Sequence, residues 1–215
     1  MRTRIKICGI TRVEDGLAAA QHGADAIGLN FWPGTPRVVS MSRAREIVAA
    51  LPPFLSIVGL FVDPAREEVE QVLDAVPLHF LQFHGHETSA FCRSFGRPYL
   101  KAIGVEASGD LLESVSPYDD AAGLLFDAPP LDGRPGGTGR TFEWARLPSR
   151  LPRPLVLSGG LNAGNVANAI RTVRPWAVDV SSGVEASDAN GRPRAGIKDA
   201  AKIAAFVEEV RHADD

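Results

Sequence analysis

The chain opens with the short apolar run RIKIC (residues 4–8), which Gly9 follows at once. A run this short and apolar, ended by a glycine, is typical of a buried parallel strand rather than of an edge strand. The next residues, TRVE (11–14), have the Thr/Glu spacing of a capping box and predict the start of a helix. Cys8 is therefore expected where a strand passes into a loop, the position at which α/β barrels place their chemistry.

Short apolar runs alternate with helix-like segments along the rest of the chain. Eight such runs in 215 residues correspond to about 27 residues a unit, the length of a compact βα repeat. The predicted strands cover residues 4–8, 26–31, 55–62, 79–83, 99–103, 123–127, 154–157 and 177–180. Helices are predicted at residues 42–51, 64–76, 87–95, 165–173 and 198–210.

This repeat favours a single small (β/α)8 TIM barrel, with a doubly wound open sheet as the alternative. An open sheet usually carries a GxGxxG turn after its first strand, and CGIT (8–11) lacks it. No linker divides the sequence, so we expect one domain over residues 1–215. The two longest loops, 128–141 and 185–196, each follow a predicted strand and are expected on the catalytic face.

Composition excludes several classes of partner. The net charge of −3 provides no basic surface for nucleic acid or an anionic membrane. No run approaches the roughly 18 apolar residues of a membrane span, and no apolar leader precedes the first strand. Two cysteines, Cys8 and Cys92, are too few for a disulfide framework. We therefore expect a cytoplasmic protein without nucleic-acid or membrane partners, and the sequence leaves monomer and homodimer both open.

Two glycine-bearing turns follow the last two predicted strands, SGGLN (158–162) and SSGV (181–184). Glycine lets backbone N–H groups approach an anion, and a helix start behind them adds a favourable dipole. A single turn of this kind is more often an ordinary tight turn. Because the loops after strands 7 and 8 are the usual phosphate site of a barrel, the two together predict phosphate binding.

Cys8 and Asp127 end two strands that lie far apart in the sequence. An acid at the end of the apolar run GLLFD (123–127) is costly to bury without a partner or a task. Taken singly, a buried cysteine is usually a small apolar side chain, and a structural partner could account for the aspartate. Together they indicate a base and an acid that face one substrate, whereas Cys92, between Phe91 and Phe95, is interpreted as core.

Two further polar residues are candidates. Arg37 follows Pro36, and its planar guanidinium suits a carboxylate, although an exposed loop arginine is the alternative. His84, in QFHG (82–85), is either an acid/base group or a satisfied polar residue at a strand end, and we favour the latter. No cluster has the spacing of metal ligands and no nucleophile elbow occurs, so we expect neither a metal nor a catalytic serine.

At these positions the chain resembles the phosphoribosylanthranilate isomerases of tryptophan biosynthesis, nearly from end to end. It departs from the family at Thr35, Phe83 and Ser158, where Ser, Leu and Ala are common, and none of these changes removes a group that the chemistry needs. The blocks that carry the resemblance are KICGIT (6–11), GLNF (28–31), TPR (35–37), QFHG (82–85), FD (126–127), GGTG (136–139), FEW (142–144), SGGL (158–161), NV (165–166), DVSSGVE (179–185) and GIKD (196–199).

The resemblance implies an Amadori rearrangement of N-(5-phosphoribosyl)anthranilate to 1-(2-carboxyphenylamino)-1-deoxyribulose 5-phosphate, without a cofactor. It implies that Asp127 is the general acid, that Cys8 is the general base and that Arg37 holds the anthranilate carboxylate. The phosphate and ribose would be bound by Gly159, Gly160, Asp179, Ser181, Ser182 and Gly183. Further candidates by the same resemblance are Lys6, His84, Gly137 and Thr138.

This chemistry makes demands on the surroundings of both groups. An ordinary thiol is mostly protonated at neutral pH, so a base at Cys8 needs help toward the thiolate, from Lys6 or a nearby helix start. An ordinary aspartic acid is ionised, so an acid at Asp127 needs burial or nearby anions that retain its proton.

Other phosphosugar barrels remain as alternatives. An isomerase of the histidine pathway or an epimerase of pentose phosphates places carboxylates at the working strand ends, and Cys8 argues against both. A barrel that acts in both pathways is disfavoured for the same reason. From another class, the chain could be a phosphosugar-binding barrel without catalysis, although the presence of both a base and an acid speaks against this.

Overall fold

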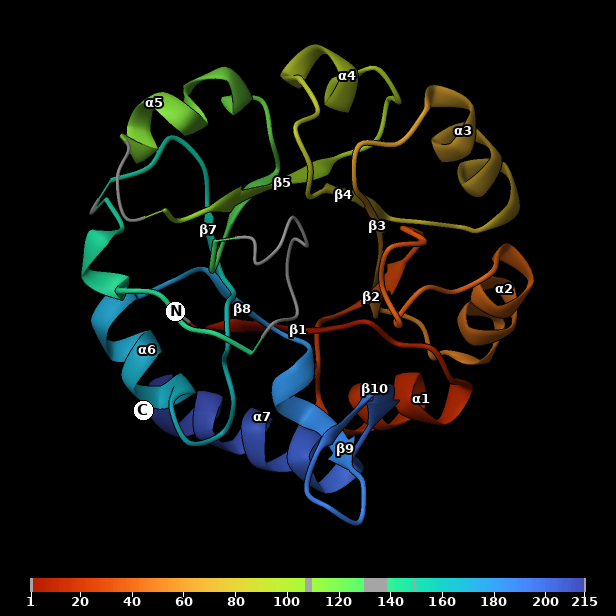
Figure 1. The fold of residues 1–215 in the computed structure, drawn as a ribbon, viewed down its shortest axis with the longest axis vertical. Helices are drawn as coiled ribbons and strands as arrows, with labels where there is room; N and C mark the ends of the chain where they lie inside the picture. Colours follow the sequence, from red (N-terminus) through yellow and green to blue (C-terminus); the bar gives the residue numbers. More distant parts are fainter. Residues whose placement is uncertain (1, 107–109, 130–138, 149, 215) are drawn as a thin grey trace.

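A closed barrel of parallel strands forms the centre of the molecule (Figure 1). The computed structural model describes residues 2–106, 110–129, 139–148 and 150–214. Each barrel strand pairs with the next in the sequence, and β8 pairs with β1 to close the ring. The strands are β1 (Arg4–Cys8), β2 (Ala26–Asn30), β3 (Ser56–Phe61), β4 (Phe80–Phe83), β5 (Tyr99–Gly104), β6 (Gly123–Asp127), β7 (Leu155–Leu157) and β8 (Ala177–Val180). The predicted TIM barrel is confirmed.

Helices surround this barrel and connect its strands (Figure 1). The α-helices are α1 (Val13–His22), α2 (Met41–Ala50), α3 (Arg66–Ala75), α4 (Ser89–Arg93), α5 (Leu111–Val115), α6 (Val166–Val173) and α7 (Ala200–Asp214). Short 3-10 turns are η1 (Ser116–Tyr118), η2 (Trp144–Arg146) and η3 (Ser182–Val184). Across the described ranges, none of the helices has both the length and the apolar character needed to cross a membrane.

The alternation of side chains along β1 explains how the barrel positions its chemistry. Successive residues of a strand point to opposite faces of the sheet. Ile5 and Ile7 are buried in the main apolar core, together with residues of the surrounding helices. Lys6 instead bonds Asp179 of β8, so the alternate positions Lys6 and Cys8 face the barrel interior. Cys8 is the last of them and lies at the carboxyl end of the strand.

The predicted capping box at the start of α1 is wrong. The helix begins at Val13 with Arg12 as its N-cap residue, and no side chain caps it. The hydroxyl of Thr11 instead donates to the backbone carbonyl of Gly196, which is distant in the sequence. Arg12 donates to Asp15 in the first turn, with Nη2 to Oδ1 at 2.6 Å. The Thr11 hydroxyl, which the sequence pattern predicted to cap α1, therefore bonds a residue that is distant in the sequence.

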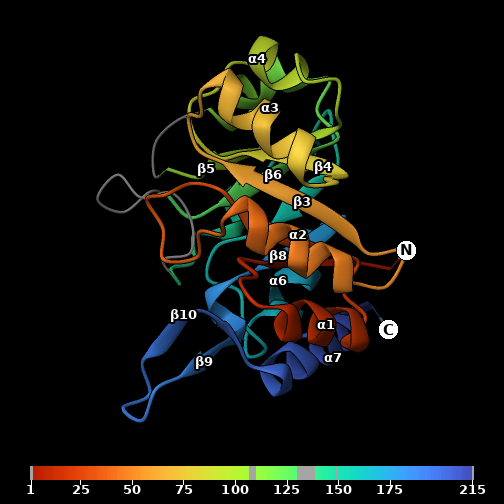
Figure 2. The same ribbon diagram turned by 90° about the vertical axis from the view of Figure 1, so that its right-hand side faces the viewer.

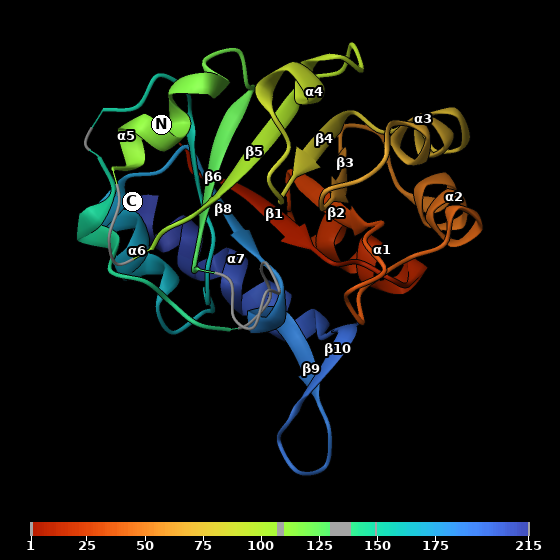
Figure 3. The same ribbon diagram turned by 45° about the horizontal axis from the view of Figure 1, so that its top comes forward.

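The predicted loop 185–196 contains a two-stranded antiparallel sheet of β9 (Glu185–Ser187) and β10 (Pro193–Lys198). This hairpin projects beside the barrel in Figure 2 and Figure 3. The helix predicted to start at Lys198 begins instead at Ala200, and Lys198 ends β10. The strands were missed because they pair only with each other, in an irregular register, and carry no apolar alternation.

Candidate active site

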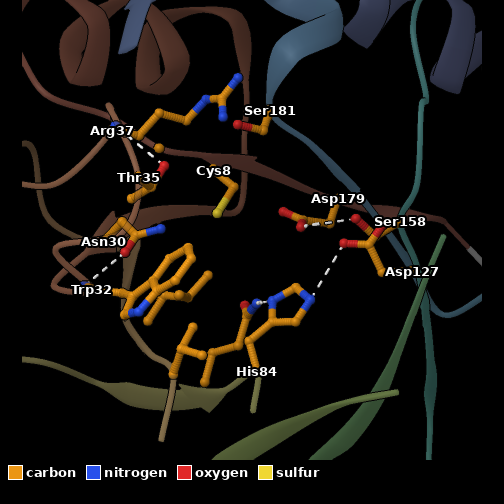
Figure 4. Close-up of a pocket in the computed structure, with 14 residues that line it drawn as sticks. Cys8, Asn30, Trp32, Thr35, Arg37, His84, Asp127, Ser158, Asp179 and Ser181 are labelled. Carbon is orange, nitrogen blue, oxygen red and sulfur yellow. Dashed lines mark hydrogen bonds and ion pairs between the residues drawn. The ribbon is translucent and has the colours of Figure 1, made fainter. Parts of the chain in front are cut away.

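A pocket at the carboxyl ends of the barrel strands brings the predicted base and acid together (Figure 4). Cys8 reaches it from β1 and Asp127 from β6, and both side chains are largely buried. The lining residues are Cys8, Gly9, Asn30, Trp32, Thr35, Arg37, Leu60, Val62, Gln82, His84, Asp127, Ser158, Asp179 and Ser181. One small molecule in this pocket can therefore meet a thiol and a carboxyl at the same time.

Lys6 and Asp179 form a buried ion pair beside Cys8. Nζ of Lys6 donates to Oδ1 of Asp179 at 2.8 Å, and Ser158 Oγ donates to Oδ2 at 3.3 Å. Burial lowers the pKa of Lys6, but the charges of Asp179 and Cys8 oppose it, and the net pKa is raised. The Lys6 side chain is therefore an ammonium at neutral pH.

The pKa of the Cys8 thiol is raised above its ordinary value. Burial is the largest cause, and the charge of Asp179 acts in the same direction. The charges of Lys6 and Lys198 lower the pKa but do not outweigh burial. Lys6 therefore lies beside Cys8, as the sequence analysis expected. Because burial outweighs the charges of the two lysines, Cys8 is a protonated thiol at neutral pH.

Asp127 meets His84 in the pocket. Nε2 of His84 lies 3.4 Å from Oδ2 of Asp127, and the backbone N–H of Ala128 donates to Oδ1 at 2.7 Å. The other ring nitrogen of His84 lies 3.2 Å from Nε2 of Gln82. His84 thus has polar partners, as we favoured from the sequence, but one of them is the candidate acid.

Arg37 is held in the pocket by Glu185 of β9. Nε of Arg37 donates to Oε1 at 2.7 Å and Nη2 donates to Oε2 at 2.9 Å, a two-point contact that fixes the plane of the guanidinium. Burial raises the pKa of Glu185, but the bonds to Arg37 and the charge of Lys198 outweigh it and lower the pKa. Glu185 is therefore ionised. Sequence patterns did not single out Glu185, because its partner Arg37 lies 148 positions away in the chain.

The two glycine-bearing turns pack against each other beyond β7 and β8. A Cβ on Gly183 would lie 2.0 Å from the carbonyl oxygen of Leu161, so only glycine permits this approach. Gly159 and Gly160 both have positive φ, +86° and +61°. Among the hydrogen bonds of the described residues, none uses the backbone N–H of Ser182 or Gly183. Those two groups are available to an anion.

The structure gathers most of the predicted residues at this end of the barrel. Gly137, Thr138 and most of the 128–141 loop lie outside the described residues. In the part of the chain that is described, no group of three or more His, Cys, Asp or Glu side chains is placed to hold a metal ion. The apolar side of the pocket, formed by Trp32, Leu60 and Val62, was not predicted. The position of Trp32, just after a predicted strand, was a signal that could have indicated it.

Comparison with known proteins agrees with this geometry. The family model described as N-(5'-phosphoribosyl)anthranilate (PRA) isomerase matches residues 5–209. The N-(5'-phosphoribosyl)anthranilate isomerase of Pseudomonas paraeruginosa is 57% identical over 208 residues, which cover 97% of this chain and 95% of that protein.

Solved structures are similar over the same length. The crystal structure of phosphoribosyl anthranilate isomerase from Thermotoga maritima superposes with a TM-score of 0.86 at 41% identity, covering 98% of this chain and 99% of that one. A crystal structure of phosphoribosyl anthranilate isomerase in complex with reduced 1-(o-carboxyphenylamino)-1-deoxyribulose 5-phosphate has a TM-score of 0.81 at 39% identity, with coverage of 98% and 99%.

Proposed function

Because the chain belongs to the N-(5'-phosphoribosyl)anthranilate isomerase family, it is an isomerase of tryptophan biosynthesis, and we propose that Asp127 and Cys8 are its acid and base. The reaction is the Amadori rearrangement of N-(5'-phosphoribosyl)anthranilate to 1-(2-carboxyphenylamino)-1-deoxyribulose 5-phosphate. The observation that carries the assignment is the meeting of the Cys8 thiol and the Asp127 carboxyl in a single pocket at the carboxyl end of the barrel, where the second carboxyl, that of Asp179, is already paired with Lys6.

The proposed orientation of the substrate follows from the charges and apolar surface of the pocket. Arg37 binds the anthranilate carboxylate, and the aromatic ring lies against Trp32. The phosphate lies at the turns after β7 and β8, where the N–H groups of Ser182 and Gly183 are available. The ribose then spans the space between Cys8 and the candidate acid.

Asp127 acts first in this scheme. It gives its proton to the ribose ring oxygen as the C1–O bond breaks, and the nitrogen lone pair forms the C1=N bond of a Schiff base. The nearby ring of His84 is a positioning partner that keeps the carboxyl turned into the pocket. No cofactor is required, because the substrate's own nitrogen makes the C2 proton acidic.

Cys8 acts second. Its thiol gives its proton to solvent, and the resulting thiolate takes the C2 proton and so becomes a thiol again. The C–H electrons form a C1=C2 bond and the C=N electrons return to nitrogen, which gives an enolamine. The enolamine gains a proton at C1 from solvent and loses its hydroxyl proton to solvent to become the ketone. Asp127 regains its proton from solvent, so both groups return to their starting states. The ammonium of Lys6 stabilises the thiolate while it exists.

The whole chain, residues 1–215, is proposed to work as one domain on a free small molecule. The barrel closes between β1 and β8, and α7 contacts both α1 and α6. Near the two ends, the backbone N–H and hydroxyl of Thr3 both donate to Asp214 at 2.7 Å. A phosphorylated substrate is retained in the cytoplasm because its charge prevents passage through a membrane, so the cytoplasm is the proposed location.

Turnover of freshly generated substrate tests the proposal. The anthranilate ring of phosphoribosylanthranilate is fluorescent, so its loss can be followed with wild-type protein and with Cys8→Ser in parallel. We expect loss with wild type and a roughly hundredfold or greater decrease in kcat for Cys8→Ser. If wild type binds the phosphosugar but does not convert it, the chain is a binding barrel and the assigned acid and base are wrong.

A further inference from the structure

Lys198, at the end of β10, places a buried lysine side chain between Ser181, which lines the pocket, and Glu185, which holds Arg37. The residue is 4% exposed. Its Nζ lies 3.0 Å from the backbone carbonyl oxygen and 3.4 Å from the hydroxyl of Ser181, and 3.3 Å from Oε1 of Glu185. The hairpin that carries Lys198 lies beside the barrel, so its side chain reaches back into the barrel end from outside the ring of strands.

The three contacts join groups that serve opposite ends of the proposed substrate. Ser181 opens the phosphate loop (residues 181–183), which follows β8. Glu185 and Arg37 form the carboxylate clamp, in which Glu185 fixes the guanidinium. Lys198 is bonded to a residue of each, so one side chain sets the spacing between the phosphate loop and the carboxylate clamp.

Burial lowers the pKa of Lys198, and the charge and hydrogen bond of Glu185 oppose this shift without outweighing it. Taking a lysine side chain out of water is costly, and an apolar side chain of similar volume would often stabilise the fold at least as well. An apolar side chain could not, however, make the hydrogen bonds of Lys198 to Ser181 and Glu185. These two contacts are therefore what the lysine contributes at this position.

We propose that Lys198 is a positioning residue that holds the phosphate loop and the carboxylate clamp at the spacing the substrate spans. The inference rests on the proposed function of Arg37 and of the loop at Ser181. It assigns a binding role to the β9–β10 hairpin, which contributes no strand to the barrel.

Lys198 also acts on the candidate base through its charge. The charged groups that influence Cys8 are Lys6, Asp179 and Lys198, and the two lysines lower the pKa of the thiol. Loss of the Lys198 charge therefore raises the Cys8 pKa further. A purely structural role of Lys198 would not predict this change.

Lys202, in the first turns of α7 just after the hairpin, offers a matched control. Its Nζ donates to the backbone carbonyl of Glu185 at 2.8 Å and to the hydroxyl of Ser187 at 3.0 Å. Lys202 thus holds β9 from the outer side. In the described residues it has no bond to Ser181 or to the carboxylate of Glu185, so Lys202→Met removes a lysine that contacts the hairpin without touching the proposed link.

The experiment compares Lys198→Met with Lys202→Met and wild type. We expect Lys198→Met to raise KM roughly tenfold to hundredfold, with a smaller decrease in kcat, because charge-assisted bonds are lost. Binding of inorganic phosphate and of anthranilate, each measured alone by calorimetry, should both weaken. Alkylation of Cys8 should need a higher pH. Lys202→Met should match wild type in all of these measurements.

Several results would overturn the inference. Lys198→Met with wild-type KM and wild-type affinity for both probes would remove the link. If Lys198→Met does not fold, Lys198→Gln retains a donor to Ser181 without the charge and is tested in the same way. Failure of both variants to fold would make Lys198 a stability residue only. If wild type lacks turnover, the proposed function fails, and weaker binding of phosphate and anthranilate to Lys198→Met still decides the role of Lys198.

Discussion

Nε2 of His84 lies 3.4 Å from Oδ2 of Asp127, although their strands, β4 and β6, are not neighbours in the barrel. The two side chains meet because both extend from strand ends into the pocket. The contact with His84 therefore holds the carboxyl that we propose as the acid in one orientation in the pocket.

Substitution of Asp127 by Asn removes the acid and keeps the shape. We expect kcat to fall roughly hundredfold to ten-thousandfold with a smaller change in KM, since proton donation to the ring oxygen is lost. The control is Asp63→Asn, because Asp63 also follows a barrel strand and pairs with a histidine, His86, but does not line the pocket. Near wild-type kcat in folded Asp127→Asn would assign the acid to another group.

Alkylation of Cys8 should show an unusual pH dependence. Burial favours the neutral thiol and raises its pKa, so the rate with iodoacetamide should keep rising beyond the pH at which an ordinary cysteine levels off. The acid limb of kcat/KM should follow the same ionisation. Burial raises the pKa of Cys92 to about 12, so a Cys8→Ala variant should react little over this range. A plateau at or below the ordinary cysteine pKa would show that the lysines prevail over burial.

Arg37→Ala should weaken substrate binding more than it slows the chemical step. Loss of a charge-assisted contact to the carboxylate predicts a KM roughly tenfold to hundredfold higher. Arg43→Ala is the matched control, because among the described residues the only ion pair of Arg43 is an exposed one with Glu46, one turn further along the same helix, α2. Steady-state kinetics of the two variants measure the difference, and an unchanged KM in Arg37→Ala would remove this residue from the carboxylate site.

Gly183→Ala should damage the phosphate site. The added Cβ would lie 2.0 Å from the carbonyl oxygen of Leu161, so the turns after β7 and β8 must separate. We expect weaker binding of inorganic phosphate and a higher KM. In the same region Gly164→Ala places its Cβ 3.2 Å from a side-chain oxygen of Asn162, which can shift, and should bind phosphate like wild type. Equal phosphate affinity in both variants would contradict the assignment.

Much of the fold could be predicted from local pattern. Short apolar runs ended by glycine or a polar residue predict buried parallel strands, and eight of them at regular spacing predict a barrel. Since all strands of such a barrel run in one direction, Cys8 and Asp127, each at the last position of its strand, had to lie at the same end. That conclusion required no tertiary information.

Only the tertiary structure decided which polar groups become partners. The hydroxyl of Thr11 bonds Gly196 instead of capping α1, and Glu185 holds Arg37. Lys198, which local pattern assigned to the start of a helix, instead ends β10 and reaches Ser181. An apolar residue needs only to be buried, so periodicity predicts its environment. A buried polar group needs a specific partner at hydrogen-bond distance, and that partner is set by closure of the barrel between segments that the sequence holds far apart.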